Sequence, residues 1–157
     1  MPNLLIIRGL PGSGKSMFAK SILNVSNDCA LVSKSFNNII YTHHYEADMF
    51  FENDGSYNFQ KKFISFAHDW CYTNVIKSLL DGNNTIVSNT FVKFWELEKY
   101  LDIPYLFNNS VAISVIELCT QFDSIHNVPT DTIKKMKANW EEIPQEIAQN
   151  ITITQRR

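Results

Sequence analysis

The feature that most constrains the fold of this chain is a glycine-rich segment near its start. Residues 9–16 read Gly-Leu-Pro-Gly-Ser-Gly-Lys-Ser and match the pattern G-x-x-x-x-G-K-[ST] in full. A uniformly apolar run at residues 4–7 precedes the motif, and apolar residues at helical spacing over residues 17–25 follow it. Uniformly apolar runs are typical of buried parallel strands. The motif is therefore predicted to form the turn between a buried strand and a helix.

This motif predicts a loop that binds phosphate groups. Its glycines let successive backbone N–H groups turn inward, and the following helix directs its positive end to the same point. The Lys15 ammonium is expected to reach the β- and γ-phosphates, and the Ser16 hydroxyl to hold Mg²⁺. The residues expected to surround the nucleotide are Gly9, Pro11, Gly12, Ser13, Gly14, Lys15, Ser16 and Met17. The cofactors expected are ATP and Mg²⁺, although the motif itself does not choose between ATP and GTP.

The rest of the chain alternates strand and helix candidates. Strands are predicted at residues 85–87 and 111–116, with a further apolar patch at 30–32 and residues 39–41 open between strand and loop. Helices are predicted at residues 59–80, 95–101 and 130–140, residues 117–122 can be read as helical, and the polar tail from residue 151 is expected to be frayed. This alternation predicts a three-layer α/β fold with four or five parallel strands. We expect one domain over residues 1–157, with a short helical lid and closing helix at about 117–142.

Composition excludes several classes of protein. The length of 157 residues fits one domain, and 45% apolar with 19% charged residues is an ordinary globular mixture. The net charge of −2 excludes a generally cationic nucleic-acid coat but leaves room for a local basic groove. Three cysteines without a C-x-x-C pair argue against a disulfide framework and a zinc site. Because no signal peptide or membrane-spanning stretch is apparent, we expect a soluble cytoplasmic protein with no membrane partner.

Further motifs follow the loop in a fixed order. They are Glu-Ala-Asp-Met-Phe-Phe at 46–51, Asp-Gly-Ser-Tyr-Asn-Phe at 54–59, Ala-His-Asp-Trp-Cys at 67–71, Ile-Val-Ser-Asn-Thr-Phe at 86–91 and His-Asn-Val-Pro at 126–129. Together with residues 8–16, this set resembles the small P-loop kinases related to the phage polynucleotide kinase domain, an AAA-type ATP-binding kinase domain. The resemblance spans nearly the whole chain. It implies transfer of the γ-phosphoryl group of ATP to a hydroxyl, the 5′-hydroxyl of a nucleic-acid end being the founding example.

The resemblance also implies roles for individual residues. Asp48 corresponds to the base that receives the hydroxyl proton; a cap of a helix or turn and a ligand to a magnesium-bound water are the alternatives. Asn89 and Thr90 are expected to line the acceptor site. His68 is open between a site residue and a satisfied core histidine, and a structural role is favoured for His126.

Two departures from the family pattern bear on catalysis. Ser88 stands where the family usually has an aspartate, and it supplies no charge. No arginine occurs between Arg8 and Arg156, although the lid of these kinases normally carries arginines that clamp the transferring phosphoryl group. Lys134, with Lys135 and Lys137 beside it, is the candidate substitute, and a solvated basic helix face is the alternative reading. A protein partner that supplies an arginine in trans is a further possibility.

Three function hypotheses follow from these observations. The first is a polynucleotide 5′-hydroxyl kinase. The second is a kinase for a nucleoside monophosphate or a small metabolite, and the third is a slow or non-catalytic nucleotide-binding module that acts through a partner. Two further groups of residues have simpler interpretations than a functional one. His43 and His44 are expected to form a surface pair rather than a metal site. A core stripe is favoured over base stacking for the aromatic residues Phe50, Phe51, Tyr57, Phe59 and Trp70.

Overall fold

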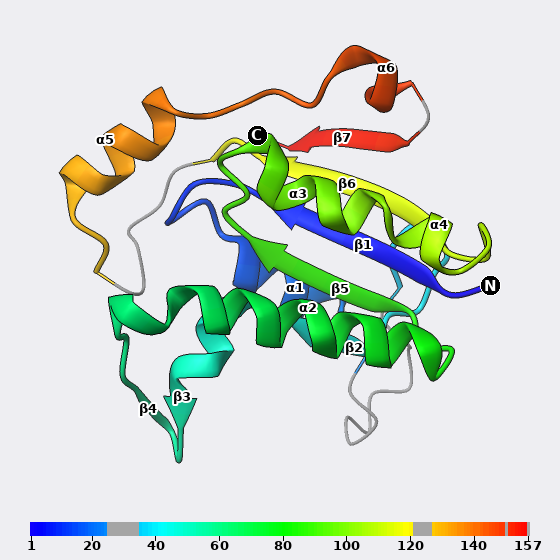
Figure 1. Ribbon diagram of the computed structural model, residues 1–157, viewed down its shortest axis with the longest axis horizontal. Helices are drawn as coiled ribbons and strands as arrows, with labels where there is room; N and C mark the ends of the chain where they lie inside the picture. Colours follow the sequence, from blue (N-terminus) through cyan, green and yellow to red (C-terminus); the bar gives the residue numbers. More distant parts are fainter. Residues whose placement is uncertain (25–34, 121–126, 150, 157) are drawn as a thin grey trace.

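A parallel five-stranded sheet forms the centre of the molecule (Figure 1). The computed structural model describes residues 1–24, 35–120, 127–149 and 151–156. The strands are β1 (Asn3–Arg8), β2 (His43–Tyr45), β5 (Thr85–Asn89), β6 (Ala112–Leu118) and β7 (Thr152–Arg156). Their order across the sheet is β2-β5-β1-β6-β7, and each neighbouring pair is parallel. Because β1 lies between two strands and two helical layers, its apolar residues 4–7 are completely buried.

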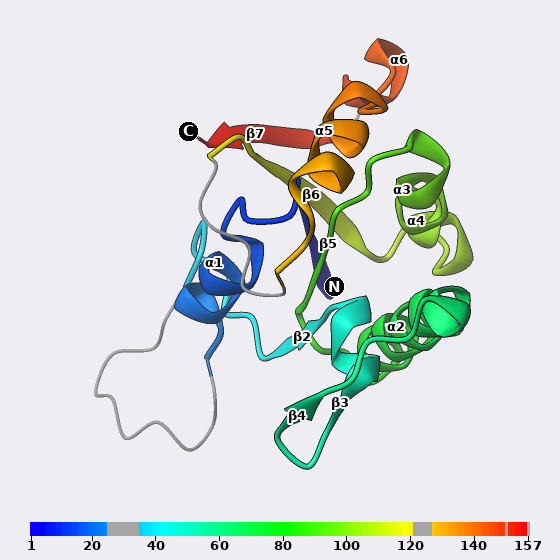
Figure 2. The ribbon, with the colours of Figure 1, turned by 90° about the vertical axis from the view of Figure 1, so that its left-hand side faces the viewer.

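Helices cover both faces of the sheet, as Figure 2 shows. The α-helices are α1 (Lys15–Ile22), α2 (Ile64–Leu80), α3 (Phe94–Leu101), α4 (Ile103–Leu106), α5 (Thr130–Ala138) and α6 (Gln145–Ala148). Two 3₁₀ helices, η1 (Ala47–Phe51) and η2 (Lys61–Phe63), flank a small antiparallel hairpin of β3 (Glu52–Asn53) and β4 (Ser56–Tyr57). Helix α1 lies on one face of the sheet, and α2, α3 and α4 lie on the other. The α/β fold with three layers, predicted from the alternating pattern, is confirmed.

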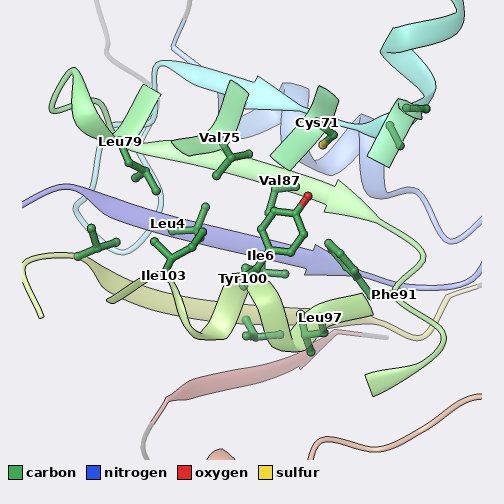
Figure 3. Close-up of a cluster of buried hydrophobic side chains, with 14 of the residues drawn as sticks. Leu4, Ile6, Cys71, Val75, Leu79, Val87, Phe91, Leu97, Tyr100 and Ile103 are labelled. Carbon is green, nitrogen blue, oxygen red and sulfur yellow. The ribbon is translucent and has the colours of Figure 1, made fainter. Parts of the chain in front are cut away.

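Side chains of β1 divide the core between the two faces. Leu5 and Ile7 pack with Ala19 and Ile22 of α1 in one buried cluster. Leu4 and Ile6 point to the opposite face, where a larger cluster is built by α2 and α3 (Figure 3). The labelled members of this larger cluster include Cys71, Val75, Leu79, Leu97 and Tyr100. The period-two alternation of strand side chains therefore supplies both helical layers from one apolar run.

The C-terminal tail differs from the prediction of a frayed end. Residues 152–156 form β7, which pairs with β6 in parallel so that Ile153 lies opposite Val115. Isoleucine and threonine alternate over residues 151–154, and β-branched residues favour strands. Ile151 and Ile153 pack against the larger core cluster. The tail is thus held by its pairing with β6 and by the packing of its isoleucine side chains against the core.

The structure decides two local readings that the sequence left open. Glu117 and Leu118 continue strand β6 rather than opening a helix, because they pair with Arg8 of β1 and Arg156 of β7. The edge strand β2 comprises residues 43–45, whereas Tyr41 makes only an isolated bridge to Leu23. The apolar patch at 30–32 and residues 121–122 lie outside the described residues. Within the part of the chain that the structure describes, no helix is both long enough and apolar enough to cross a membrane.

Candidate active site

The glycine-rich loop connects the end of β1 to the first turn of α1. Gly12 and Gly14 have φ values of 80° and 86°, a left-handed conformation that glycine adopts without steric cost. Gly9 is required for a different reason, because a Cβ atom there would lie 2.9 Å from the Leu118 carbonyl oxygen. The Phe18 amide donates to the Gly14 carbonyl at 2.9 Å, so the helix begins directly after the loop. The loop thus has the backbone form expected of an anion-binding concavity at a helix N-terminus.

Lys15 holds its ammonium group inside this loop. Its Nζ atom donates to the Leu10 carbonyl oxygen at 3.0 Å. Burial lowers the pKa of Lys15 to about 8, while the nearby carboxylates of Glu46 and Asp48 oppose that shift. A phosphate that enters the loop would stabilise the charged form of this buried ammonium group.

Two carboxylates face the loop from the segment that follows β2. The Glu46 Oε2 atom accepts hydrogen bonds from the Ser16 hydroxyl at 2.6 Å and from the Ser88 hydroxyl at 3.0 Å. Asp48 lies two residues further along the chain, in η1, and its Oδ1 atom accepts a hydrogen bond from the Tyr57 hydroxyl at 3.0 Å. Burial, together with the charge and hydrogen bond of Asp48, raises the pKa of Tyr57, so the phenol stays protonated as a donor. The segment therefore brings one carboxylate to the loop serine and a second one beside it.

Asn89 fixes the position of this acidic segment. Its side-chain oxygen accepts a hydrogen bond from the Ala47 amide at 2.8 Å, and its amide nitrogen lies 3.6 Å from the Cys71 sulfur atom. The first bond ties the start of η1 to the end of β5, two elements that are 42 residues apart in sequence. Asn89 therefore positions the carboxylates as well as lining the cavity.

A cavity of about 630 Å³ opens beside the loop, at the carboxyl ends of the strands. Its lining residues are Pro11, Gly12, Gly14, Lys15, Ser16, Met17, Glu46, Ala47, Asp48, Phe51, Tyr57, Phe59, Lys61, Ile64, His68, Ser88, Asn89, Thr90, Asn127, Val128, Pro129, Thr132 and Met136. Ligands in open α/β sheets bind at this edge. The volume suits a compact organic ligand rather than an ion alone.

Most of the predicted site residues meet in this cavity. Asp48, His68, Asn89 and Thr90 line it together with most of the loop. Gly9 and Ser13 are buried and are not part of the lining. Lys134, by contrast, has an exposed side chain 4.0 Å from Asp131 and is not part of the lining. His126 lies outside the described residues.

Sequence reasoning missed two charged residues of the site. The sequence singles out Glu46 only as part of a motif, and helical spacing places Lys61 in a predicted helix. The signal for Glu46 was its position at the end of a strand, two residues before Asp48. Lys61 lies in η2, before α2, and brings a positive charge to the wall of the cavity.

The prediction of a surface histidine pair is wrong for His44. Its Nε2 atom lies 2.7 Å from the Ser88 hydroxyl and 3.9 Å from Glu46 Oε2, and its side chain is 2% exposed. Strand β2 places it there because His44 is in register with Ile86 of β5. Burial lowers the pKa of His44, and Glu46 opposes the shift. His44 therefore belongs to the hydrogen-bonded network behind the loop.

The aromatic residues divide between core and cavity. Phe51 is buried, and its ring centroid lies 5.1 Å from that of Phe59 and 6.3 Å from that of Tyr57. Tyr57 and Phe59 are partly exposed and line the cavity with Phe51. The favoured reading of a core stripe is therefore wrong for most of the set, because only Phe51 is buried, Trp70 is half-buried, and Phe50, Tyr57 and Phe59 are exposed. Phe51, Tyr57 and Phe59 together form an aromatic wall of the cavity.

His68 stands between two cavities. It lines the large one and a second one of about 270 Å³ between α2 and α3. Burial lowers the pKa of His68, so the imidazole is neutral at physiological pH. A neutral imidazole can donate or accept a hydrogen bond from a ligand in either cavity.

Arg8 is committed to holding the fold together. Its Nη1 atom donates to Glu117 at 3.1 Å, and its Nη2 atom donates to the carbonyls of Phe91 at 2.7 Å and Glu141 at 2.9 Å. Its guanidinium lies 3.9 Å from the centre of the Trp140 ring. The side chain is completely buried and does not line the cavity. Arg8 therefore does not serve as a clamp on a phosphoryl group.

The donor set fits Mg²⁺ held mainly by a bound nucleotide. Mg²⁺ prefers oxygen ligands and usually keeps several waters, with one or two carboxylates and the substrate phosphates nearby. Ser16 and the two carboxylates provide such oxygens. In the described ranges, no cluster of three or more histidine, cysteine or acidic residues forms a cage for a metal. The site fits a metal that arrives with its nucleotide.

Comparison with known proteins places the chain in a family. A family model described as an AAA domain matches residues 4–121. The chain belongs to the AAA domain family. Human NEDD4-binding protein 2 is 24% identical to it over an alignment of 147 residues that covers 88% of this chain. This AAA domain spans only 8% of the length of that relative.

Two solved structures are similar to this domain. A gluconokinase from Sinorhizobium meliloti 1021 matches 98% of this AAA domain and 82% of its own chain, with a TM-score of 0.51 and 13% identity. A chain of the Pnkp1/Rnl/Hen1 RNA repair complex matches 95% of this domain and 42% of its own length, with a TM-score of 0.48 and 20% identity. The fold is an α/β fold of P-loop kinase type, as the sequence predicted.

Proposed function

We propose that this AAA domain is an ATP- and Mg²⁺-dependent phosphotransferase whose acceptor is the 5′-hydroxyl of a polynucleotide. One observation carries the proposal: Lys15 of the loop and the carboxylate of Asp48 line the same cavity. A phosphate-binding cation and a carboxylate that can receive a proton are the two groups that transfer to a hydroxyl requires.

The residues of the candidate site have different parts in the proposed reaction. The loop N–H groups and Lys15 bind the phosphates, and Ser16 holds Mg²⁺, which supplies positive charge on the phosphate oxygens when bound. Tyr57 orients the Asp48 carboxylate through its 3.0 Å hydrogen bond. Asp48 orients the acceptor hydroxyl and takes its proton. The hydroxyl oxygen forms a bond to the γ-phosphorus while the bond from that phosphorus to the β–γ bridging oxygen breaks, and ADP leaves.

The wall of the cavity supports a nucleic-acid end as the acceptor. Tyr57 and Phe59 present rings on which a base can stack, and Lys61 adds a positive charge that suits a backbone phosphate. The ordered motifs that resemble the phage polynucleotide kinase domain point to the same acceptor. A nucleoside monophosphate would use the same ring and charge, and it is the main competing acceptor.

The test is transfer of label from γ-labelled ATP with Mg²⁺ to a panel of acceptors. The panel holds 5′-hydroxyl RNA and DNA oligomers, nucleosides, nucleoside monophosphates, a sugar and water alone. We expect label on the oligomer ends and none with Lys15→Ala, which loses the phosphate-binding cation. Label on a small molecule only would reject the polynucleotide acceptor and retain a kinase.

A second candidate is a nucleotide-binding module that acts through a protein partner. One observation favours it: Arg8 is pinned in the core, and the sequence has no other arginine before Arg156. A partner that inserts an arginine would supply the missing charge in the transition state. Tight ATP binding without label on any acceptor in the panel would support this candidate over the first.

A further inference from the structure

We propose that Glu46 supplies the acidic group of the Mg²⁺ site, in place of the carboxylate that Ser88 lacks. Ser88 stands at the end of β5, where the family resemblance leads one to expect an aspartate. Strand β2 is the neighbour of β5, and Glu46 directly follows its last residue. The negative charge at this position thus comes from the residue that follows the adjacent strand. The inference rests on the nucleotide and Mg²⁺ binding in the proposed function, and not on the identity of the acceptor.

The distances explain how a glutamate serves from the adjacent strand. Neighbouring strands are about 4.8 Å apart, and glutamate is one methylene longer than aspartate. Glu46 uses this reach to bring Oε2 within 3.0 Å of the Ser88 hydroxyl and within 2.6 Å of the Ser16 hydroxyl. The same oxygen therefore lies next to the loop serine and next to the position where the expected aspartate is missing.

The contact with Ser16 prepares that hydroxyl for a cation. A serine hydroxyl has one hydrogen and two acceptor lone pairs. Ser16 donates its hydrogen to Glu46, so its lone pairs point away from the carboxylate. A lone pair in that position can bind Mg²⁺, and the carboxylate balances the charge of the metal from behind the serine. Glu46 is accordingly a positioning residue for Ser16 and a carboxylate for the metal's waters.

Ser88 and His44 hold Glu46 in this orientation. Ser88 donates its single hydrogen to Glu46, so the His44 Nε2 atom 2.7 Å away must carry the hydrogen that Ser88 accepts. The network runs from His44 through Ser88 to Glu46 and Ser16, and all four side chains are at least partly buried. Each donor in the network is directed toward the carboxylate.

The effect of Glu46 on nucleotide binding should differ with and without a divalent cation, and this difference distinguishes a carboxylate that binds the metal from one that only supports the fold. Without a divalent cation, the negative charge of Glu46 repels the phosphates of the nucleotide. With the cation present, the same charge attracts the metal–nucleotide complex. Glu46→Gln should therefore leave metal-free nucleotide binding unchanged or tighter and weaken the Mg²⁺-dependent part. A change that merely disturbed the loop would weaken both.

The experiment is calorimetric titration of ADP and of a non-hydrolysable ATP analogue into the protein, in EDTA and at increasing Mg²⁺. We expect Glu46→Gln to raise the Mg²⁺ concentration for half-maximal effect by about tenfold to a hundredfold. Electron paramagnetic resonance of Mn²⁺ measures metal affinity directly and should show the same loss. Glu98→Gln, an exposed glutamate on α3, is the matched control and should change nothing.

A charge-relocation variant keeps the test decisive if Glu46→Gln fails to fold. Glu46→Ser combined with Ser88→Asp returns the carboxylate to β5 and should restore the Mg²⁺ dependence, whereas Glu46→Ser alone should not. An unchanged Mg²⁺ requirement in Glu46→Gln, or an equal loss with and without metal, would overturn the inference. Failure of the proposed function is a separate result, since it would appear as normal Mg²⁺-dependent nucleotide binding without label on any acceptor.

Discussion

At the scale of single residues, the site depends on which side chains donate hydrogen bonds and which groups accept them. Glu46 accepts from two serines, Tyr57 donates to Asp48, and Lys15 is held by a carbonyl oxygen of its own loop. The loop residues could be predicted because their pattern is local and contiguous. Glu46 could not, because its partners Ser16 and Ser88 are 30 and 42 residues away and meet it only through the pairing of β2 with β5.

The pKa of Lys15 makes nucleotide affinity depend on pH. Burial lowers this pKa to about 8, so the ammonium loses its proton as the pH rises through that value. Phosphates favour the charged form, and binding above pH 8 must then take up a proton. We expect affinity to be level below about pH 7 and to fall toward tenfold per pH unit well above pH 8.

Calorimetry in buffers of different ionisation enthalpy measures this proton uptake. Lys15→Arg is the matched control, because a guanidinium stays protonated over the whole range and should flatten the pH dependence. An affinity for nucleotide that stays constant from about pH 7 to pH 9 in the unmodified protein would contradict the assignment of a buried, pH-sensitive Lys15 to the phosphates.

At the scale of elements, strand register and not local pattern decides what joins the site. Strands β1, β5 and β6 could be predicted from their apolar or β-branched runs, since each is buried by neighbours on both sides. Strand β2 is a three-residue edge strand of His-His-Tyr, which has no apolar run to recognise. Strand β7 carries alternating isoleucine and threonine, but its place at the end of the chain favoured fraying, and only its pairing with β6 shows otherwise.

The buried ion pair of Arg8 and Glu117 links several elements and should matter for stability. It joins β1 to β6, and Arg8 also holds the segment after α5 through Trp140 and Glu141. Removing one partner leaves the other charge buried without compensation. Arg8→Met is expected to lower the free energy of unfolding by about 3–5 kcal/mol, measured by urea denaturation.

A double variant checks the cause of that loss. Arg8→Met with Glu117→Leu removes both charges, and it should be more stable than the sum of the two single changes predicts. If the two losses were simply additive, the pair would not be coupled, and the account of Arg8 as the partner of Glu117 would be wrong.

At the scale of the whole molecule, the sheet brings the parts of the candidate site together at one edge. The phosphate loop, the acidic segment and the end of β5 meet at the carboxyl ends of the parallel strands, beside the start of α2 and helix α5 (Figures 1 and 2). The aromatic wall and Lys61 close the same cavity from the hairpin side. The architecture follows from the alternating sequence pattern. The aromatic wall could not be predicted in the same way, because it depends on the contacts of Phe51 with Tyr57 and Phe59.

The measurement that tests the central claim most directly compares the unmodified protein with Asp48→Asn. Both are given γ-labelled ATP, Mg²⁺ and an oligonucleotide with either a 5′-hydroxyl or a 5′-phosphate end, and ATP binding is measured in parallel. The account predicts label on the 5′-hydroxyl oligomer only, and a loss of about 10²- to 10⁴-fold in Asp48→Asn while ATP still binds. Transfer at the normal rate by Asp48→Asn, or no label on the 5′-hydroxyl end from a protein that binds ATP, would contradict it.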